Sequence, residues 1–129
     1  MDQDNGTEVY MLLLHYVRKH VPTNTKIYLH CFSGDEYVLQ QWRGVFPNLY
    51  LGFTRLVNSF DEHQMKALRS VDNKHLLLET DAPYFPISGQ RWSSPGQLYS
   101  VAEIVAGIRK VSAKSILQFA ASNARDLFG

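Results

Sequence analysis

The stretch KIYLHCFSGDEYVLQQWRGV, residues 26–45, decides the fold, because a short apolar run leads directly into an amphipathic helical pattern. Residues 27–32 are rich in apolar and aromatic side chains and end shortly before Gly34, as is typical of a buried strand. Ser33 and Glu36 then have the spacing of a capping box ahead of apolar residues at helical intervals. The stretch therefore predicts a strand followed at once by a helix.

The same strand and helix pattern recurs twice further along the chain. Residues 49–53 (LYLGF) predict a second strand, and Ser59 with Glu62 gives a second capping-box spacing before another helix. Residues 75–80 (HLLLET) predict a third strand. Repetition of short apolar strands between helices is typical of a parallel sheet covered on both faces.

Further amphipathic helices precede and follow these units. Residues 7–20 predict a helix that ends before Pro22, and two helices are predicted after the Pro/Gly/Ser-rich segment 82–97. The apolar stripes of these three helices are, in turn, Val9, Leu12, Leu13, Tyr16 and Val17; Leu98, Val101, Val105 and Ile108; and Ile116, Leu117, Phe119, Ala120 and Leu127. The fold class is α/β in the order αβαβαβαα. Three strands cannot close a barrel, so periodicity leaves open an isolated three-stranded sheet or part of a (β/α)₈ barrel.

The composition indicates one globular unit without an obvious charged or membrane-bound surface. Of 129 residues, 45% are hydrophobic, as is typical of a globular domain. The net charge is +1, so the overall charge does not indicate a basic surface for nucleic acid. No run is long enough to span a bilayer, and the polar start MDQDNGTE does not resemble a secretion signal. The single cysteine, Cys31, cannot form an internal disulfide. We therefore expect a reducing compartment, cytoplasm or nucleus, and no membrane partner.

Ionisable side chains fall at the ends of two predicted strands. His30 lies near the end of the first, and Glu79 and Asp81 lie at the end of the third, two residues apart and so on the same side. Reactive groups in parallel α/β folds gather at the carboxyl ends of strands, and imidazole with carboxylate suits a divalent metal such as Zn²⁺ or Mn²⁺. Two structural alternatives remain: His30 as a hydrogen-bonded core residue, and Asp81 as a turn former before Ala-Pro. Alternation places Cys31 opposite His30, as a small buried hydrophobe.

Three residues in the loops after the strands are candidates for substrate binding. The guanidinium groups of Arg55 and Arg91 are suited to pairing with phosphate, and the indole of Trp92 to stacking on a base. The alternative for all three is an ordinary surface loop.

Four strings, in order along the chain, resemble the TatD family of metal-dependent nucleases. They are LHCFSGD (29–35), LYLGFT (49–54), LLLETDAPYF (76–85) and SNARDLF (122–128), and together the match covers nearly the whole chain. The resemblance implies a (β/α)₈ barrel of the amidohydrolase-like metal-dependent hydrolases, whose last three strands are those predicted above. Residues 1–129 are then expected to be the C-terminal portion of a single such domain, with the N-terminal part of the barrel absent.

The resemblance also implies a metal site and an activity. Family metal ligands comprise His-x-His on the first strand, a Glu on a middle strand, a His on the fifth, the His of HCFSG and the Asp of ETDAPY; only the last two map here, as His30 and Asp81. Asp81 would also hold or deprotonate the attacking water, and Glu79 would orient a ligand or that water. The implied cofactors are divalent ions, Mg²⁺, Mn²⁺ or Zn²⁺, two in the complete enzyme.

The implied function is metal-dependent phosphodiester hydrolysis, with 3′ to 5′ exonuclease and endonuclease action both open. The implied substrate is DNA, with RNA or an RNA–DNA hybrid as alternatives, and the implied partner is the missing N-terminal half. Two other readings of the function stay open: an inert or interaction fragment, and a hydrolase of the same superfamily that acts on a substrate other than nucleic acid.

Overall fold

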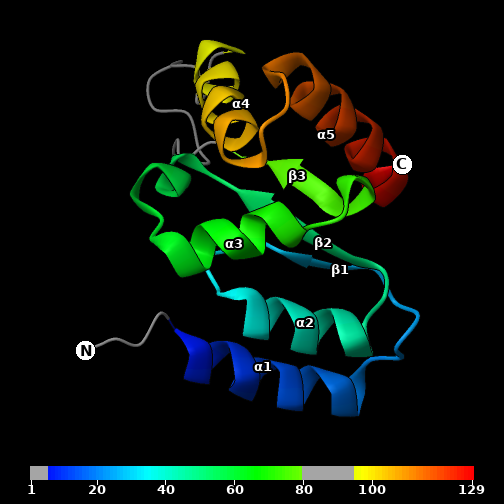
Figure 1. Ribbon diagram of the computed structural model, residues 1–129. Helices are drawn as coiled ribbons and strands as arrows, with labels where there is room; N and C mark the ends of the chain where they lie inside the picture. Colours follow the sequence, from blue (N-terminus) through cyan, green and yellow to red (C-terminus); the bar gives the residue numbers. More distant parts are fainter. Residues whose placement is uncertain (1–5, 80–94) are drawn as a thin grey trace, which may run out of the picture.

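The computed structural model of the chain describes residues 6–79 and 95–129, with three strands in one sheet and helices packed around it (Figure 1). Along the chain the elements are α1 (Thr7–His20), β1 (Ile27–Leu29), α2 (Glu36–Val45), β2 (Leu49–Phe53), the 3₁₀ helix η1 (Arg55–Ser59), α3 (Glu62–Ser70), the 3₁₀ helix η2 (Asn73–His75), β3 (Leu76–Leu78), α4 (Pro95–Arg109) and α5 (Ala113–Phe128). The predicted order of helices and strands is confirmed.

The sheet is parallel, with the strands in the order β1-β2-β3. Leu29 of β1 pairs with Leu51 of β2, and Leu51 pairs with Leu76 of β3. Because these leucines are in register, they lie on one face of the sheet. The α/β class predicted from the alternation of apolar runs is therefore confirmed.

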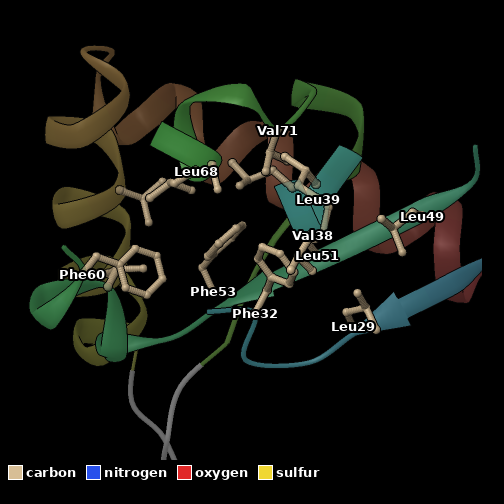
Figure 2. Close-up of a cluster of buried hydrophobic side chains, with 14 of the residues drawn as sticks. Leu29, Phe32, Val38, Leu39, Leu49, Leu51, Phe53, Phe60, Leu68 and Val71 are labelled. Atoms are coloured by element: carbon tan, nitrogen blue, oxygen red, sulfur yellow. The ribbon is translucent and has the colours of Figure 1, made fainter. Parts of the chain in front are cut away.

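The main core lies between that face and the helices α2 and α3. Figure 2 shows the strand residues Leu29 and Leu51 beside side chains from the helices, including Leu39 of α2 and Leu68 of α3. Leu39 and Leu68 are fully buried, as are Phe46 and Phe53. Burial of side chains this large contributes about 1.5 to 3 kcal/mol each, so this layer fixes the sheet in place.

Helices α4 and α5 lie together on the β3 side of the sheet, whereas α1 and α2 lie toward β1 (Figure 1). Arg109, the last residue of α4, donates to the carbonyl oxygens of Leu68 and Val71. Asn123 of α5 is buried and donates through Nδ2 to the carbonyls of Asn73 and Leu76, each at 2.7 Å. These bonds hold α4 to the C-terminal end of α3 and α5 to the start of β3.

Two strands are shorter than the sequence predicts. The strand expected at 27–32 ends at Leu29, because the chain turns at His30 and Cys31 takes a left-handed backbone with φ of 50°. The strand expected at 75–80 spans Leu76–Leu78, because His75 belongs to η2. Thr80 lies outside the described residues. Strand 49–53 is confirmed.

Both predicted capping boxes are wrong. The N-cap of α2 is Asp35, whose side chain accepts from the Val38 N–H, rather than Ser33. The N-cap of α3 is Asp61, which forms a capping box with Gln64. Asp is as good an N-cap as Ser, and in each case it stands directly before the first helical residue.

The face that α1 turns inward also differs from the prediction. Of the expected stripe, four residues are exposed, and only Val17 packs against the core. The inward side is instead formed by Leu14, which is buried, with Tyr10 and Met11 partly buried. The exposed four are Val9 (70% exposed), Leu12 (63%), Leu13 (44%) and Tyr16 (59%). In contrast, the predicted stripes of α4 and α5 contain Val101, Val105 and Ile116, which are inaccessible to solvent. The helices also bury three residues outside those stripes, Ala102, Ala106 and Asn123.

Within the described residues, no helix is long and apolar enough to cross a membrane.

Candidate functional site

A histidine and a carboxylate meet at the carboxyl edge of the sheet. His30 follows β1 and Glu79 follows β3, and because the strands are parallel their ends lie at the same edge. Nδ1 of His30 lies 2.7 Å from Oε2 of Glu79. The His30 side chain is 69% exposed, whereas that of Glu79 is only 15% exposed. The structure thus brings together two of the three ionisable residues that the sequence places at strand ends.

The Glu79 carboxylate is held by three donors. Oε2 accepts from the hydroxyl of Tyr28 and from His30 Nδ1, and Oε1 accepts from the backbone N–H of Cys31 at 2.8 Å. An ionised carboxylate has about four acceptor positions, so three of them are engaged here. The backbone N–H of Glu79 itself donates to the carbonyl of Phe53 at 2.8 Å, which fixes the residue to β2. Glu79 is therefore placed to orient its neighbours.

The His30 ring is held in one orientation with its other nitrogen available. Its ring lies against that of Tyr28, with centroids 3.9 Å apart. Because Oε2 of an ionised Glu79 can only accept, Nδ1 of a neutral His30 carries the proton and Nε2 keeps its lone pair. Nε2 has no hydrogen-bond partner among the described residues. The alternative that His30 is a core residue is therefore wrong, because its ring projects into solvent.

A glycine makes room for this cluster. Gly52 of β2 lies beneath Glu79 and Tyr28, and a Cβ placed there would come within 2.6 Å of the Glu79 carboxyl carbon and 2.9 Å of the Tyr28 ring. Any larger residue would displace the carboxylate. Neither Tyr28 nor Gly52 was identified from the sequence, although Tyr28 stands two residues before His30 and so shares its side of the strand.

In the described part of the chain, the side chains at this edge fit one imidazole metal ligand that is supported by a carboxylate. Metal-binding histidines commonly donate their second ring nitrogen to a carboxylate, which is the arrangement of His30 and Glu79. Across residues 6–79 and 95–129, no group of three or more His, Cys, Asp or Glu side chains is close enough to hold an ion. Asp81, the second predicted ligand, lies outside the described residues.

Of the three residues predicted to bind substrate, one lies in the described part of the chain and two do not. Arg55 begins η1, two residues after the end of β2. It is exposed and has no ion pair or hydrogen-bonded side-chain partner among the described residues. Arg91 and Trp92 lie outside the described residues. The prediction that Cys31 is a buried hydrophobe is wrong: its thiol is exposed, because the left-handed turn at Cys31 replaces the strand alternation on which that prediction rested.

A parallel α/β sheet with an oriented histidine at its carboxyl edge places the chain among β/α folds, which carry their sites at this edge. Comparison with known families is more specific. The family model described as TatD related DNase matches residues 6–129, and the chain belongs to this family.

Curated relatives are similar over most of this chain but are longer than it. The human 3'-5' RNA nuclease TATDN2 is 36% identical over 99 residues, which are 71% of this chain and 13% of that protein. The 3'-5' ssDNA/RNA exonuclease TatD of Edwardsiella piscicida is 34% identical over 110 residues, 78% of this chain and 41% of the relative. An uncharacterized metal-dependent hydrolase of Bacillus subtilis, YabD, is 30% identical, and 40% of its length is covered.

Solved structures support the fold. The hydrolase TatD family protein from Entamoeba histolytica superposes with a TM-score of 0.73 at 19% identity, over 93% of this chain and 48% of that one. The TatD homologue YJJV from Escherichia coli gives a TM-score of 0.70 at 22% identity, over 93% and 46%. The described sheet and helices therefore correspond to about half of a TatD-type barrel, which agrees with the barrel alternative rather than an isolated sheet.

Proposed function

We propose that this chain supplies part of the active site of a divalent-metal phosphodiesterase that hydrolyses nucleic acid. The observation that carries the proposal is the His30 ring, oriented by Glu79 at the carboxyl edge of a parallel sheet, with Nε2 directed away from its protein partner. Membership of the TatD related DNase family supports it, as do relatives that are called nucleases and metal-dependent hydrolases.

In this proposal His30, through Nε2, and Asp81 hold a divalent ion. Such an ion, when bound, polarises a phosphoryl oxygen and makes a bound water more acidic. Glu79 keeps the His30 ring in one tautomer and one orientation, and Asp81 accepts a proton from the attacking water. The family's His-x-His motif does not occur in the printed sequence, so we propose that further ligands come from outside this chain. Mg²⁺, Mn²⁺ and Zn²⁺, two ions per site, remain the candidate cofactors.

We propose a single strand of DNA or RNA as the substrate, attacked from its 3′ end. The relatives called 3'-5' RNA nuclease and 3'-5' ssDNA/RNA exonuclease support this choice, and an RNA–DNA hybrid is a third substrate to test. Arg55 and Arg91 would pair with phosphates, and Trp92 would stack on a base. An exposed free thiol at Cys31 supports a reducing compartment, cytoplasm or nucleus.

The decisive experiment uses this chain completed by a segment that carries the other family ligands. It compares wild type with Asp81→Asn and His30→Ala in a nuclease assay on a 3′-labelled single strand, with Mg²⁺, Mn²⁺ or Zn²⁺ and with EDTA. Asp81→Asn keeps the shape of the side chain and removes its charge, so we expect most hydrolysis to be lost at every metal concentration. His30→Ala removes one neutral ligand, so we expect metal affinity to fall by more than the roughly 10- to 100-fold typical of losing a residue that only supports a ligand. Activity should recover in part as metal is added. Wild-type turnover by Asp81→Asn with verified metal loading would contradict the proposal.

A further inference from the structure

A cavity of about 430 Å³ lies next to the His30 and Glu79 pair, on the η1 side of the sheet edge. It is lined by Cys31, Thr54, Arg55, Leu56, Asn58 and Ser59. This volume is within the range of sites that bind small ligands, about 300 to 1,000 Å³. A site of this size can hold one nucleotide unit of a longer strand.

The cavity is built on the ends of two strands. Cys31 follows His30 directly, and Thr54 follows the last residue of β2. The Cys31 sulfur lies 3.6 Å from the Thr54 hydroxyl oxygen, so the segments that follow the two strands are in contact beside the cavity. The cavity therefore adjoins the proposed catalytic edge through Cys31.

Three polar side chains of η1 are available at this cavity. Arg55, Asn58 and Ser59 are exposed, and none has a hydrogen-bonded side-chain partner among the described residues. The Thr54 hydroxyl, in contrast, is already engaged, because it accepts from the Leu56 N–H and caps η1.

Among the described residues of the lining, Arg55 is the one charged side chain, and none of them is a carboxylate. A guanidinium, an amide and a hydroxyl together offer hydrogen-bond donors suited to a phosphodiester, whereas a cation would be repelled.

We propose that this cavity binds an internucleotide phosphate of a single-stranded nucleic acid, next to the phosphate that is hydrolysed. The inference rests on the proposed nuclease function and adds a subsite to it: Arg55 pairs with the phosphate, and Asn58 and Ser59 donate to its oxygens. Phosphate contacts of this kind position a strand without reading its sequence. A small phosphodiester with no second phosphate cannot use the subsite.

The test is made on this chain completed by a segment that carries the other family ligands. It uses two substrates, a short single-stranded oligonucleotide and bis(p-nitrophenyl) phosphate, with Arg55→Ala as the variant. For the oligonucleotide we expect KM to rise about tenfold with kcat little changed, because an arginine to phosphate contact contributes binding to substrate and transition state alike. For bis(p-nitrophenyl) phosphate, which has no second phosphate, we expect a smaller rise in KM than for the oligonucleotide. Arg55→Lys keeps the charge but not the paired donors, so its KM should lie between the two.

Binding of the labelled oligonucleotide in EDTA, measured against salt concentration, tests the subsite without turnover. Loss of one phosphate contact should reduce the slope of log K against log salt by about 0.7 in Arg55→Ala. The matched control is Arg125→Ala, because Arg125 is also an exposed arginine. It lies far from the cavity, near the C-terminus of α5. There the carbonyl of the neighbouring Asp126 accepts from Lys26, which precedes β1 and so lies at the end of that strand opposite to the cavity. The control should leave the slope unchanged.

The outcomes separate the two proposals. An unchanged salt slope in Arg55→Ala, or an equal loss of activity on both substrates, would overturn the subsite. Failure of the wild-type chain, completed by a segment that carries the other family ligands, to hydrolyse either substrate would overturn the nuclease function. The salt slope in EDTA would still decide whether the cavity binds a strand.

Discussion

At the scale of single residues, the candidate site depends on one carboxylate that accepts from three donors. Glu79 connects Tyr28, His30 and the backbone of Cys31, so one side chain sets the direction of the imidazole and the shape of the turn after β1. The left-handed backbone at Cys31 is strained for a residue with a Cβ, and the hydrogen bond from its N–H to Glu79 offsets part of that cost. Glu79 therefore has a structural role as well as a proposed functional one.

Gly52→Ala tests whether this cluster needs the space beneath it. The added Cβ would overlap the Glu79 carboxylate and the Tyr28 ring, so we expect a loss of about 1 to 3 kcal/mol in unfolding free energy and weaker metal affinity. Urea denaturation and metal titration measure the two effects.

The matched control for that prediction is Gly44→Ala. Gly44 lies within α2, and a Cβ there meets nothing within 4 Å. Alanine is the better helix former by up to about 1 kcal/mol, so this variant should be slightly more stable. If both variants behaved alike, the contact between Gly52 and Glu79 would not constrain the site.

At the scale of elements, the turns and caps at the two ends of the strands have different tasks. The carboxyl ends lead into the turn at His30 and into η1, which carry the candidate site and the cavity. The opposite ends are tied to the C-terminal helices by Arg109 and Asn123. Contacts that stabilise the fold and residues with a proposed function thus lie at opposite ends of the strands, as is common in β/α barrels.

Asn123→Ala tests the connection between α5 and β3. The change leaves the carbonyls of Asn73 and Leu76 without the amide that now donates to both, and the Leu76 bond is buried. A buried group left unsatisfied costs about 1 to 3 kcal/mol, so we expect a loss of that size in unfolding free energy, measured by urea denaturation.

Asn48→Ala is the comparison for this variant, because Asn48 also donates from Nδ2 to a backbone carbonyl, that of Asn24, but in an exposed turn. Water can replace that bond, so its loss should be well below that of Asn123→Ala. Equal losses for the two variants would show that α5 is held by its apolar face alone.

At the scale of the whole molecule, the described sheet has two open edges. Across residues 6–79 and 95–129, β1 and β3 each pair with a strand on one side only. A second cavity, of about 420 Å³, differs from the first in being apolar. It lies between the sheet and α5 and is lined by residues including Leu77, Leu117 and Phe128. Open strand edges and exposed apolar side chains favour association with other chains.

We therefore predict that the 129 residues, produced alone, associate into oligomers or aggregates and show no nuclease activity. Sedimentation and a nuclease assay measure the two outcomes, and addition of a segment that carries the other family ligands should restore metal-dependent cleavage. A Leu12→Lys, Tyr16→Lys variant serves as the comparison, because these exposed α1 residues contribute no buried core contact and their change should reduce association through α1 without unfolding the chain. A monomer that melts cooperatively and cleaves DNA by itself would contradict the prediction.

The sequence by itself determined the class of fold, the order of the elements and the placement of His30 and Glu79 at strand ends. Apolar runs of strand length between amphipathic helices admit few arrangements, because both faces of a parallel sheet must be covered. The position of an ionisable residue after such a run is a local property, so it can be read without knowledge of contacts.

Only the tertiary structure decided how those residues are used. Glu79 contacts Tyr28, which lies 51 positions earlier in the chain, and His30, which lies 49 positions earlier. No local sequence pattern contains such contacts. The exposure of Cys31 follows from a turn that this same carboxylate stabilises, and the inward face of α1 follows from the position of α2 beside it. Strand alternation and helical spacing assume regular backbone and a single buried side, whereas long-range hydrogen bonds and packing select which turn forms and which helical face is covered.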